Sequence, residues 1–317
     1  MAKNVFVETI KSGGSGQQID DLFMVSNKQL GRKKDGGAYI RMSLLDRTGS
    51  IEAVLWDDVD NVNECVRAGD YVRVTGDAKT YRDSIQITVR RLEKQEKTAI
   101  SIEDFLPVTK QDRDDMLARL KEVCGSISNE HIRRIVDAFF CDQVFVDAFK
   151  TAPAGKSMHH AYIGGLLEHT LSLALLVEKI GSHFDGVDRD ILLVGAFLHD
   201  IGKVEEFFYQ EMIDYSDAGR LLNHIVIGVQ MLEAKIASLE PFPKNLGLVL
   251  KHMIVSHHGE REFGSPEPPK TLEAIVLHYL DELDSKTNAV FNFMKAEDTD
   301  SNWTPYHKVL ERYFYKR

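Results

Sequence analysis

The apolar residues of this chain change their spacing once, near residue 95, and that change determines which kinds of unit it can form. Before it, apolar and polar residues alternate, so that Ile40, Met42 and Leu44 fall on one side of an extended segment. After Pro107 the apolar residues recur every three or four positions, as in 116–123. Alternation is typical of strands with one buried face, and the longer spacing is typical of amphipathic helices. We therefore predict an α+β multidomain chain with its strands first and its helices second.

The first 95 residues predict a small β-barrel. Strands are expected at 22–30, 39–44, 49–56, 71–75 and 85–90, and a short helix is expected within 57–67. A helix after the third of five strands is typical of the OB-fold, a frequent platform for single-stranded nucleic acid. We therefore assign 1–95 to an N-terminal five-stranded OB-type β-barrel that binds nucleic acid.

The rest of the chain predicts an all-α helical bundle. Helices are expected around 116–123, 132–139, 166–180, 190–199, 223–237, 246–256 and 272–283. Ser128 is the expected N-cap of the second of these helices. Residues 303–317 mix aromatic and basic residues at helical spacing, which predicts either a helix that closes the bundle or a contact within a homo-oligomer. We assign 96–157 to a linker and helical connector, and 158–317 to the bundle with its C-terminal helix.

Composition excludes several classes of protein. The net charge of −10 argues against binding duplex nucleic acid through bulk charge. The acid is concentrated in the helical part, because Lys and Arg number 16 against 15 Asp and Glu in 1–97, and 23 against 34 thereafter. The longest run without a polar side chain, 191–198, is far shorter than the roughly 20 residues of a membrane span. Cys65, Cys124 and Cys141 lack metal-ligand spacing, so we expect a reduced, cytoplasmic protein with no membrane partner.

The strongest functional signal is a set of histidines, of which nine of the twelve fall within 159–258. His199 and Asp200 stand together at the end of an apolar helix. Other candidates lie on or beside further apolar helices: His169, His224, His257, His258 and Asp281. Packed helices can aim such side chains into one cavity, and burying them without a cation would cost on the order of several kcal/mol each. Mixed His and Asp ligands predict a site for Mn²⁺, Fe²⁺, Co²⁺ or Zn²⁺.

The order H…HD…H…HH…D resembles the HD-domain metal-dependent phosphohydrolases, in particular their two-metal branch. The resemblance implies one divalent metal held by His169, His199, Asp200 and Asp281, and a second held by Asp200, His224 and His257 or His258. It also implies that Lys203 faces the phosphate. His160 precedes His169 by nine residues and either contacts phosphate or packs, so Asp200, Lys203 and His160 are the candidate catalytic residues.

The two halves together narrow the resemblance. An OB barrel containing 44–53, followed by the stretches 159–169 and 256–259 of the helical part, is similar to the YhaM-type 3′–5′ exoribonucleases of Gram-positive bacteria. This resemblance implies an exonuclease that binds two divalent ions, with Mn²⁺ preferred to other metals. It implies that the enzyme shortens single-stranded RNA, and secondarily single-stranded DNA, and releases nucleoside 5′-monophosphates. The Gly-Tyr-Pro signature of cyclic-di-GMP phosphodiesterases does not follow His258, and the Glu-Asp that follows the His-Asp pair in guanosine-tetraphosphate hydrolases is also missing.

The barrel supplies candidates for binding the strand. Aromatic side chains stack bases without reading sequence, and Arg and Lys hold phosphates. Arg41 and Arg73 are expected on outward faces of neighbouring strands, beside Tyr39 and Tyr71. The full candidate set is Arg32, Lys33, Tyr39, Arg41, Trp56, Arg73, Tyr81 and Arg82, with Lys34 in the same loop as the first two. The alternative is that Trp56 and one tyrosine belong to the core and that the charges form a solvated face.

Two other functions remain open at this point. One is a phosphodiesterase for small nucleotides or cyclic dinucleotides, although such a substrate needs no barrel to bind a strand. The other is a single-strand DNA-binding replication factor whose helical domain has lost activity, although the ligand set is complete. Turnover of an oligonucleotide compared with a cyclic dinucleotide separates the two enzymes.

Overall fold

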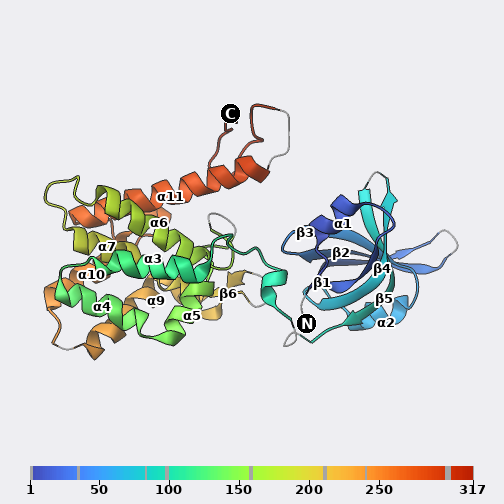
Figure 1. Cartoon of the computed structure of the whole chain (residues 1–317), viewed down its shortest axis with the longest axis horizontal. Coiled ribbons are helices and arrows are strands. Elements are labelled where there is room, and N and C mark those ends of the chain that lie inside the picture. The colour runs from blue at the N-terminus through green and yellow to red at the C-terminus, as the bar shows by residue number, and fades with distance from the viewer. Residues whose placement is uncertain are drawn as a thin grey trace. The chain divides into compact units, whose positions relative to one another are not determined.

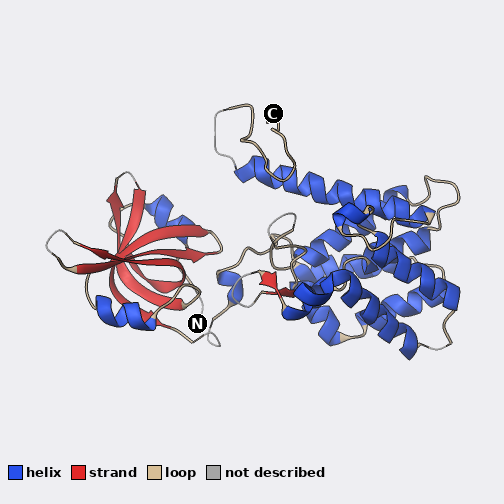
Figure 2. Cartoon of the chain, turned by 180° about the vertical axis from the view of Figure 1, so that it is seen from behind, coloured by secondary structure: helices blue, strands red, loops and turns tan. Residues whose placement is uncertain are grey.

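The computed structural model describes residues 3–33, 36–82, 84–96, 100–156, 160–209, 213–239, 241–296 and 301–316 (Figure 1). Lys34 and His159 lie outside these ranges. The chain divides into two compact units, Met1–Val108 and Thr109–Arg317. Figure 2 shows that the first unit is mostly strand and the second mostly helix, which confirms the predicted order of the two classes. The domain boundaries at 95 and 157 stay predictions.

The first unit is a closed barrel with strand order β1-β2-β3-β5-β4. Its strands are β1 (Gln18–Arg32), β2 (Ala38–Asp46), β3 (Gly49–Leu55), β4 (Tyr71–Tyr81) and β5 (Ser84–Lys94). Only β3 and β5 pair in parallel, and the other described pairs are antiparallel. The short helix α2 (Val59–Cys65) follows β3 as expected, so the OB-type fold is confirmed. The additional helix α1 (Val7–Gly13) was not predicted.

The alternating residues of β2 point into the barrel as predicted, with Ile40, Met42 and Leu44 all buried. In β1 the pairing register with β2 shifts between Val25 and Asn27, and such a bulge changes which side chains face inward. Tyr71 was expected to point outward toward solvent. It is instead only 2% exposed, because its ring packs edge-on against Phe105 from the segment that follows the barrel.

The second unit is built from helices around one hydrophobic core. Its helices are α3 (Arg113–Gly125), α4 (Glu130–Phe140), α5 (Gln143–Thr151), α6 (Gly165–Ile180), α7 (Arg189–Leu198), α8 (Lys203–Glu206), α9 (Asp217–Ser238), α10 (Lys244–Ser256) and α11 (Leu272–Ala296). The short strands β6 (Phe207–Phe208) and β7 (Asp214–Tyr215) and the short helix η3 (Arg261–Phe263) complete it, whereas the short helix η2 (Ile102–Asp104) belongs to the first unit. Side chains of α3, α4 and α5 belong to the same core as those of α6, α7 and α10.

The structure contradicts the predicted N-cap of α4 and the helical alternative for the C-terminal tail, while the oligomer contact stays a prediction. The N-cap of α4 is Asn129, whose side chain accepts hydrogen bonds from the backbone N–H groups of His131 and Ile132. The N–H of Ser128 donates instead to Asp190. The aromatic tail forms no helix within 301–316: antiparallel bridges join Trp303 to Tyr315 and His307 to Arg312. The last helix among the described residues is α11, which extends well beyond its predicted end.

No helix among the described residues combines the length and the apolar character that crossing a bilayer requires.

Candidate active site

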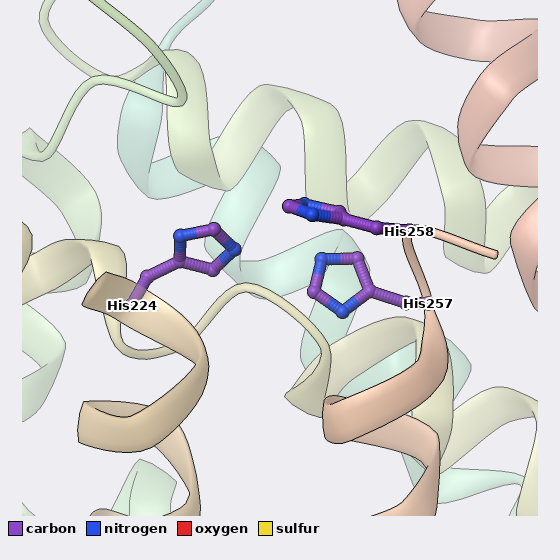
Figure 3. A group of neighbouring side chains, drawn as sticks. All are labelled: His224, His257 and His258. Carbon is purple, nitrogen blue, oxygen red and sulfur yellow. The ribbon is translucent and has the colours of Figure 1, made fainter. Parts of the chain in front are cut away.

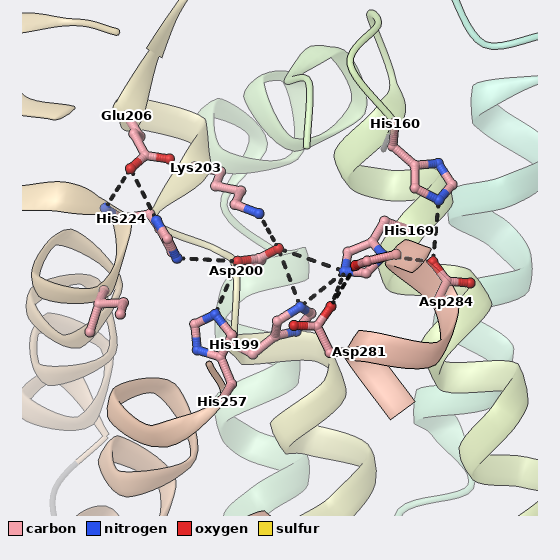
Figure 4. Close-up of polar contacts among 12 residues, drawn as sticks. His160, His169, His199, Asp200, Lys203, Glu206, His224, His257, Asp281 and Asp284 are labelled. Atoms are coloured by element: carbon pink, nitrogen blue, oxygen red, sulfur yellow. Dashed lines mark hydrogen bonds and ion pairs between the residues drawn. The ribbon is translucent and has the colours of Figure 1, made fainter. Parts of the chain in front are cut away.

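Asp200 lies at the centre of the helical unit, in the turn between α7 and α8 (Figure 4). Helix α7 is almost wholly apolar and buried, so its end carries His199 and Asp200 into the interior. The turn packs directly on α9, because a Cβ at Gly202 would lie 2.0 Å from the carbonyl oxygen of His224. Only glycine allows this approach, which brings the Asp200 turn and His224 together.

The other side chains of the group come from four helices. His169 projects from α6, His224 from α9, His257 and His258 from the end of α10, and Asp281 from α11. In α9 the backbone at Asn223 is non-helical, with φ of 64°, and the Asn223 side chain accepts a hydrogen bond from the N–H of Ile225. The helix therefore restarts at His224 and turns that ring inward.

One group of donors lies on the Oδ2 side of Asp200. The Nε2 atoms of His199 and His169 are 3.3 and 3.7 Å from this oxygen. The same two Nε2 atoms are 3.2 Å apart, and Asp281 Oδ1 is 3.2 Å from His169 Nε2. His169, His199 and Asp281 thus present three potential ligand atoms to one point.

A second group consists of His224, His257 and His258 (Figure 3) and lies on the Oδ1 side of Asp200. His224 Nε2 and His257 Nε2 are each 3.5 Å from Asp200 Oδ1. The ring of His258 lies 4.2 Å from that of His257 and 5.2 Å from that of His224, between centroids. Asp200 therefore stands between two groups of possible ligands, with one carboxylate oxygen toward each.

Several inward-facing atoms of the second group have no hydrogen-bond partner among the described residues. They are Asp200 Oδ1, His224 Nε2, His257 Nε2 and His258 Nδ1, all fully buried from solvent. Buried polar atoms are nearly always paired, and leaving several unpaired at one point is costly. The donor set is nitrogen and oxygen with no sulfur, which suits Mn²⁺, Fe²⁺, Co²⁺ or Zn²⁺. The residues present therefore fit a divalent metal.

The outer ring nitrogens of the histidines are held in place. The Nδ1–H groups of His199 and His257 donate to the carbonyl oxygens of Ala196 (2.9 Å) and Ile254 (2.7 Å). His224 Nδ1 lies 3.0 Å from Glu206 Oε1. Donation through Nδ1 leaves the Nε2 lone pair free to face a metal and orients each ring before binding.

His169 is held in the same way by Asp284, whose Oδ2 lies 2.8 Å from its Nδ1. The other oxygen of Asp284 accepts a hydrogen bond from Ser172. Sequence reasoning missed both Asp284 and Glu206. A signal was present for Asp284, because it follows Asp281 by three positions and therefore shares its face of α11. Glu206 follows Lys203 by the same interval, but nothing in the sequence pairs it with His224.

The charges of the group are strongly coupled. Burial opposes ionisation of Asp200, but Lys203 and His199 outweigh it and hold the pKa of Asp200 well below its usual range. Lys203 Nζ is 2.5 Å from Asp200 Oδ2, and this carboxylate raises the pKa of Lys203 against the effect of burial. Burial and the neighbouring His257 and His224 lower the pKa of His258 to about 3, so that its ring is neutral, as a metal ligand must be.

His160 does not contact Asp200 in this arrangement. It is 3% exposed, and its Nε2 lies 3.2 Å from Asp284 Oδ2 while its Nδ1 lies 2.8 Å from the hydroxyl of Tyr162. Of the two roles left open for His160, this position favours packing behind His169 over contact with phosphate.

A cavity of about 250 Å³ opens beside the two groups. Lys203, His257, His258 and Asp281 line its inner end. Its other walls come from the loop after α10, the outer half of α11 and the C-terminal tail. Substrate therefore has a place to lie against the candidate metal ligands.

The barrel candidates fall into separate clusters. Tyr39 and Trp56 lie with ring centroids 5.1 Å apart, and the ammonium of Lys33 is 4.9 Å from the Trp56 ring centre. Trp56 is 41% exposed, so it does not belong to the core. At the opposite hairpin, between β4 and β5, the Arg82 guanidinium lies 5.3 Å from the ring centre of Tyr81. Arg32 is exposed in the β1–β2 hairpin, near Lys33.

Arg41 and Arg73 do not lie on neighbouring strands, which corrects that prediction. Strand β1 separates β2 from β4, and Arg41 pairs with Gln29 of β1 whereas Arg73 pairs with Leu22. Seven positions along a strand amount to about 23 Å. Each arginine also has an acidic partner at 2.8 Å, Glu52 for Arg41 and Asp20 for Arg73.

Comparison with known proteins agrees with both halves of the chain. A model of the HD domain matches residues 166–286, and a model of the OB-fold nucleic acid binding domain matches residues 24–94. The chain is 33% identical over 287 residues to the 3′-5′ exoribonuclease YhaM of Bacillus velezensis, covering 90% of this chain and 89% of that protein. It is 31% identical to the 3′-5′ exoribonuclease YhaM of Bacillus subtilis, covering 100% of this chain and 98% of that protein. The chain therefore belongs to the YhaM 3′-5′ exoribonuclease family.

Proposed function

We propose that this protein is a metal-dependent 3′–5′ exoribonuclease that degrades single-stranded RNA, and secondarily single-stranded DNA, to nucleoside 5′-monophosphates. The observation that carries the proposal is the buried cluster around Asp200, with unpaired nitrogen and oxygen donors on a cavity wall. The relatives named above are 3′-5′ exoribonucleases, which supports the same direction and substrate here.

His169, His199, Asp200 and Asp281 would hold one divalent ion. Asp200, His224, His257 and His258 would hold a second, with Asp200 shared through its two oxygens. The nitrogen and oxygen donors suit Mn²⁺, Fe²⁺, Co²⁺ or Zn²⁺, and Mn²⁺ is the ion that the family resemblance implies. Ions bound there would lower the pKa of a coordinated water and offset negative charge on the phosphoryl oxygens.

The protein's own groups position the substrate and balance its charge. Lys203 carries a buried positive charge that lines the cavity and is held by Asp200, so it stands ready to face a phosphoryl oxygen. A charge fixed in advance in a buried site stabilises the transition state more than a mobile one, because no reorganisation is needed as the reaction proceeds.

The barrel would hold the strand through Tyr39, Trp56 and Lys33, which combine the exposed ring of Trp56 and the half-buried ring of Tyr39 with a cation. Stacking on such rings tolerates any base. The hairpin with Tyr81 and Arg82 offers a second place of the same kind. Arg41 and Arg73 are weaker candidates, because their guanidinium groups are already paired with carboxylates.

A direct test uses a 5′-labelled single-stranded RNA incubated with the protein in EDTA, Mg²⁺ or Mn²⁺. The expected result is a ladder that shortens from the 3′ end, needs the metal and disappears in Asp200→Asn. The matched control is Asp185→Asn, which removes an exposed carboxylate from the loop after α6 and should leave activity unchanged. RNA that stays intact with every metal would refute the proposal, and hydrolysis of a cyclic dinucleotide in its place would assign a small substrate.

A further inference from the structure

The loop after α10 presents one apolar ring at the mouth of the active-site cavity. Phe263 lies in η3, lines the cavity and is 66% exposed. Its position is set by the rest of the loop. Ser265 is buried, and its hydroxyl lies 3.0 Å from the carbonyl oxygen of Val255 and 2.8 Å from that of Glu267. The ring is therefore displayed on an anchored loop and is not required by the core.

The loop also begins directly at the candidate metal ligands. Gly259 follows His258 with φ of 78°, and a Cβ there would lie 2.3 Å from the ring of His278 on α11. The N–H of Glu260 donates to the carbonyl oxygen of His258 at 3.1 Å. These close contacts fix the start of the loop, and so the position of Phe263 relative to His257 and His258.

The cavity has two chemically different ends. Lys203, His257, His258 and Asp281 make a polar end at the candidate metals. Phe263, Ala289 and Leu310 supply apolar surface farther out, and the polar residues Glu282, Ser285 and Lys286 of α11 also line it. The charge of Glu282 is paired with Lys286 at 2.6 Å. A volume of about 250 Å³ lies at the small end of ligand-binding pockets, which favours one nucleoside over a longer piece of chain.

We propose that this cavity binds the 3′-terminal nucleoside of the strand, with the phenyl ring of Phe263 stacked on its base; the inference rests on the exonuclease function proposed above. The terminal nucleoside carries the reacting phosphate on its 5′ oxygen. Water supplies the oxygen that bonds to phosphorus and a proton to the departing 3′ oxygen of the preceding nucleotide. A polar end for phosphate beside an apolar end for a base fits this unit of substrate.

The proposal implies that the cavity binds the 3′-terminal nucleoside, which is the part released, whatever its base. Stacking of a base on an aromatic ring does not depend on the identity of the base. Removing one such ring typically lowers affinity by roughly 5- to 150-fold. We expect a loss in this range in kcat/KM for Phe263→Ala on RNA with a normal 3′ end, and near-normal values for Phe263→Tyr, which keeps the ring.

The experiment compares RNA ending in a normal nucleotide with RNA ending in an abasic nucleotide, using wild type, Phe263→Ala and Phe263→Tyr. Wild type and Phe263→Tyr should cleave the abasic end roughly 5- to 150-fold less well. For Phe263→Ala, replacing the normal end by the abasic end should lower kcat/KM little further, because the stacking contact is already lost when either the ring or the base is missing. Phe184→Ala is the control, since this residue is 48% exposed in another loop and does not line the cavity.

Equal kcat/KM for Phe263→Ala and wild type on normal RNA, or undiminished discrimination against the abasic end, would overturn the inference while leaving the exonuclease function standing. A wild type that shortens no RNA with Mn²⁺ would overturn the function. In that case, binding of a strand with 2-aminopurine at its 3′ end tests separately whether the cavity holds the terminal base. Quenching of its fluorescence by wild type and not by Phe263→Ala supports the pocket, and equal signals from both refute it.

Discussion

Asp284 should control metal affinity although it would not touch the metal. Its Oδ2 holds His169 Nδ1 at 2.8 Å, and its other oxygen accepts a hydrogen bond from Ser172. Loss of the outer partner of a metal-binding histidine typically costs 10–100-fold in affinity, which is about 1.4–2.8 kcal/mol. Asp284→Asn keeps one acceptor oxygen for His169, and the Ser172 hydroxyl can turn to accept from the new amide. We therefore expect about a tenfold loss for Asn and about a hundredfold loss for Asp284→Ala.

Titration calorimetry with Mn²⁺ on the full chain measures this loss. Asp185→Asn serves as the control, because it removes an exposed carboxylate of the same unit outside the site. Melting curves in EDTA check that each variant is folded before affinity is compared. If both Asp284 variants bind Mn²⁺ as tightly as wild type, the argument that this carboxylate orients His169 is wrong.

The pH dependence gives a second check on the same variant. Burial lowers the pKa of His169, but Asp281 and Asp284 outweigh it and raise that pKa to about 9. Below this pH a metal must displace a proton from the ring, so wild-type affinity rises with pH up to about 9. Asp284→Asn removes one cause of the raised pKa and so weakens proton competition. The loss of affinity should therefore be smaller at pH 7 than at pH 8.5, and a loss that grows as pH falls would contradict this account.

Three further results are expected. In EDTA the raised pKa of His169 contributes stability that is fully present below about pH 6.5 and is lost as pH rises through about 9, so the melting temperature of the helical unit should fall across that window in calorimetric scans. Lys33→Ala should weaken binding of single-stranded RNA to the uncleaving Asp200→Asn variant and lower the slope of log affinity against log salt by about 1, measured by fluorescence anisotropy. Burial raises the pKa of Cys124 to about 12, so peptide mapping after mild alkylation at neutral pH should find exposed Cys65 modified and Cys124 intact.

The spacing of apolar residues predicted most helices and strands, because each of these elements buries one face and exposes the other. Ile40, Met42 and Leu44 are buried on one side of β2, and the helices that carry His169 and His199 lie where their apolar spacing indicates. The tail of 303–317 shows the limit of the same reasoning. Its aromatic residues recur at helical intervals, but Trp303 faces Tyr315 across an antiparallel turn, with ring centroids 5.2 Å apart. A short amphipathic pattern cannot distinguish these two forms, since both place its rings on one side.

Predictions failed where the outcome depended on a contact distant in sequence. Tyr71 alternates like an outward residue of β4, but it is buried in a cluster to which the segment after the barrel contributes Phe105. Ser128 and Asn129 are both good capping residues, and the structure has Asn129 as the cap while Asp190, distant in sequence, accepts the N–H groups of both. Local propensity alone does not contain this information.

The candidate ligands could be found from residue type and order, whereas the groups that orient them could not. A histidine offers two ring nitrogens, and the sequence does not tell which one faces inward. The structure resolves this for His199 and His257 through backbone carbonyls one helical turn earlier, and for His224 through Glu206. An imidazole fixed in this way loses less orientational freedom when it binds a cation, so part of the cost of assembling the site is met during folding. Asp200 Oδ1 is buried and has no hydrogen-bond partner in the described part of the chain, which destabilises the fold unless a cation binds to this oxygen.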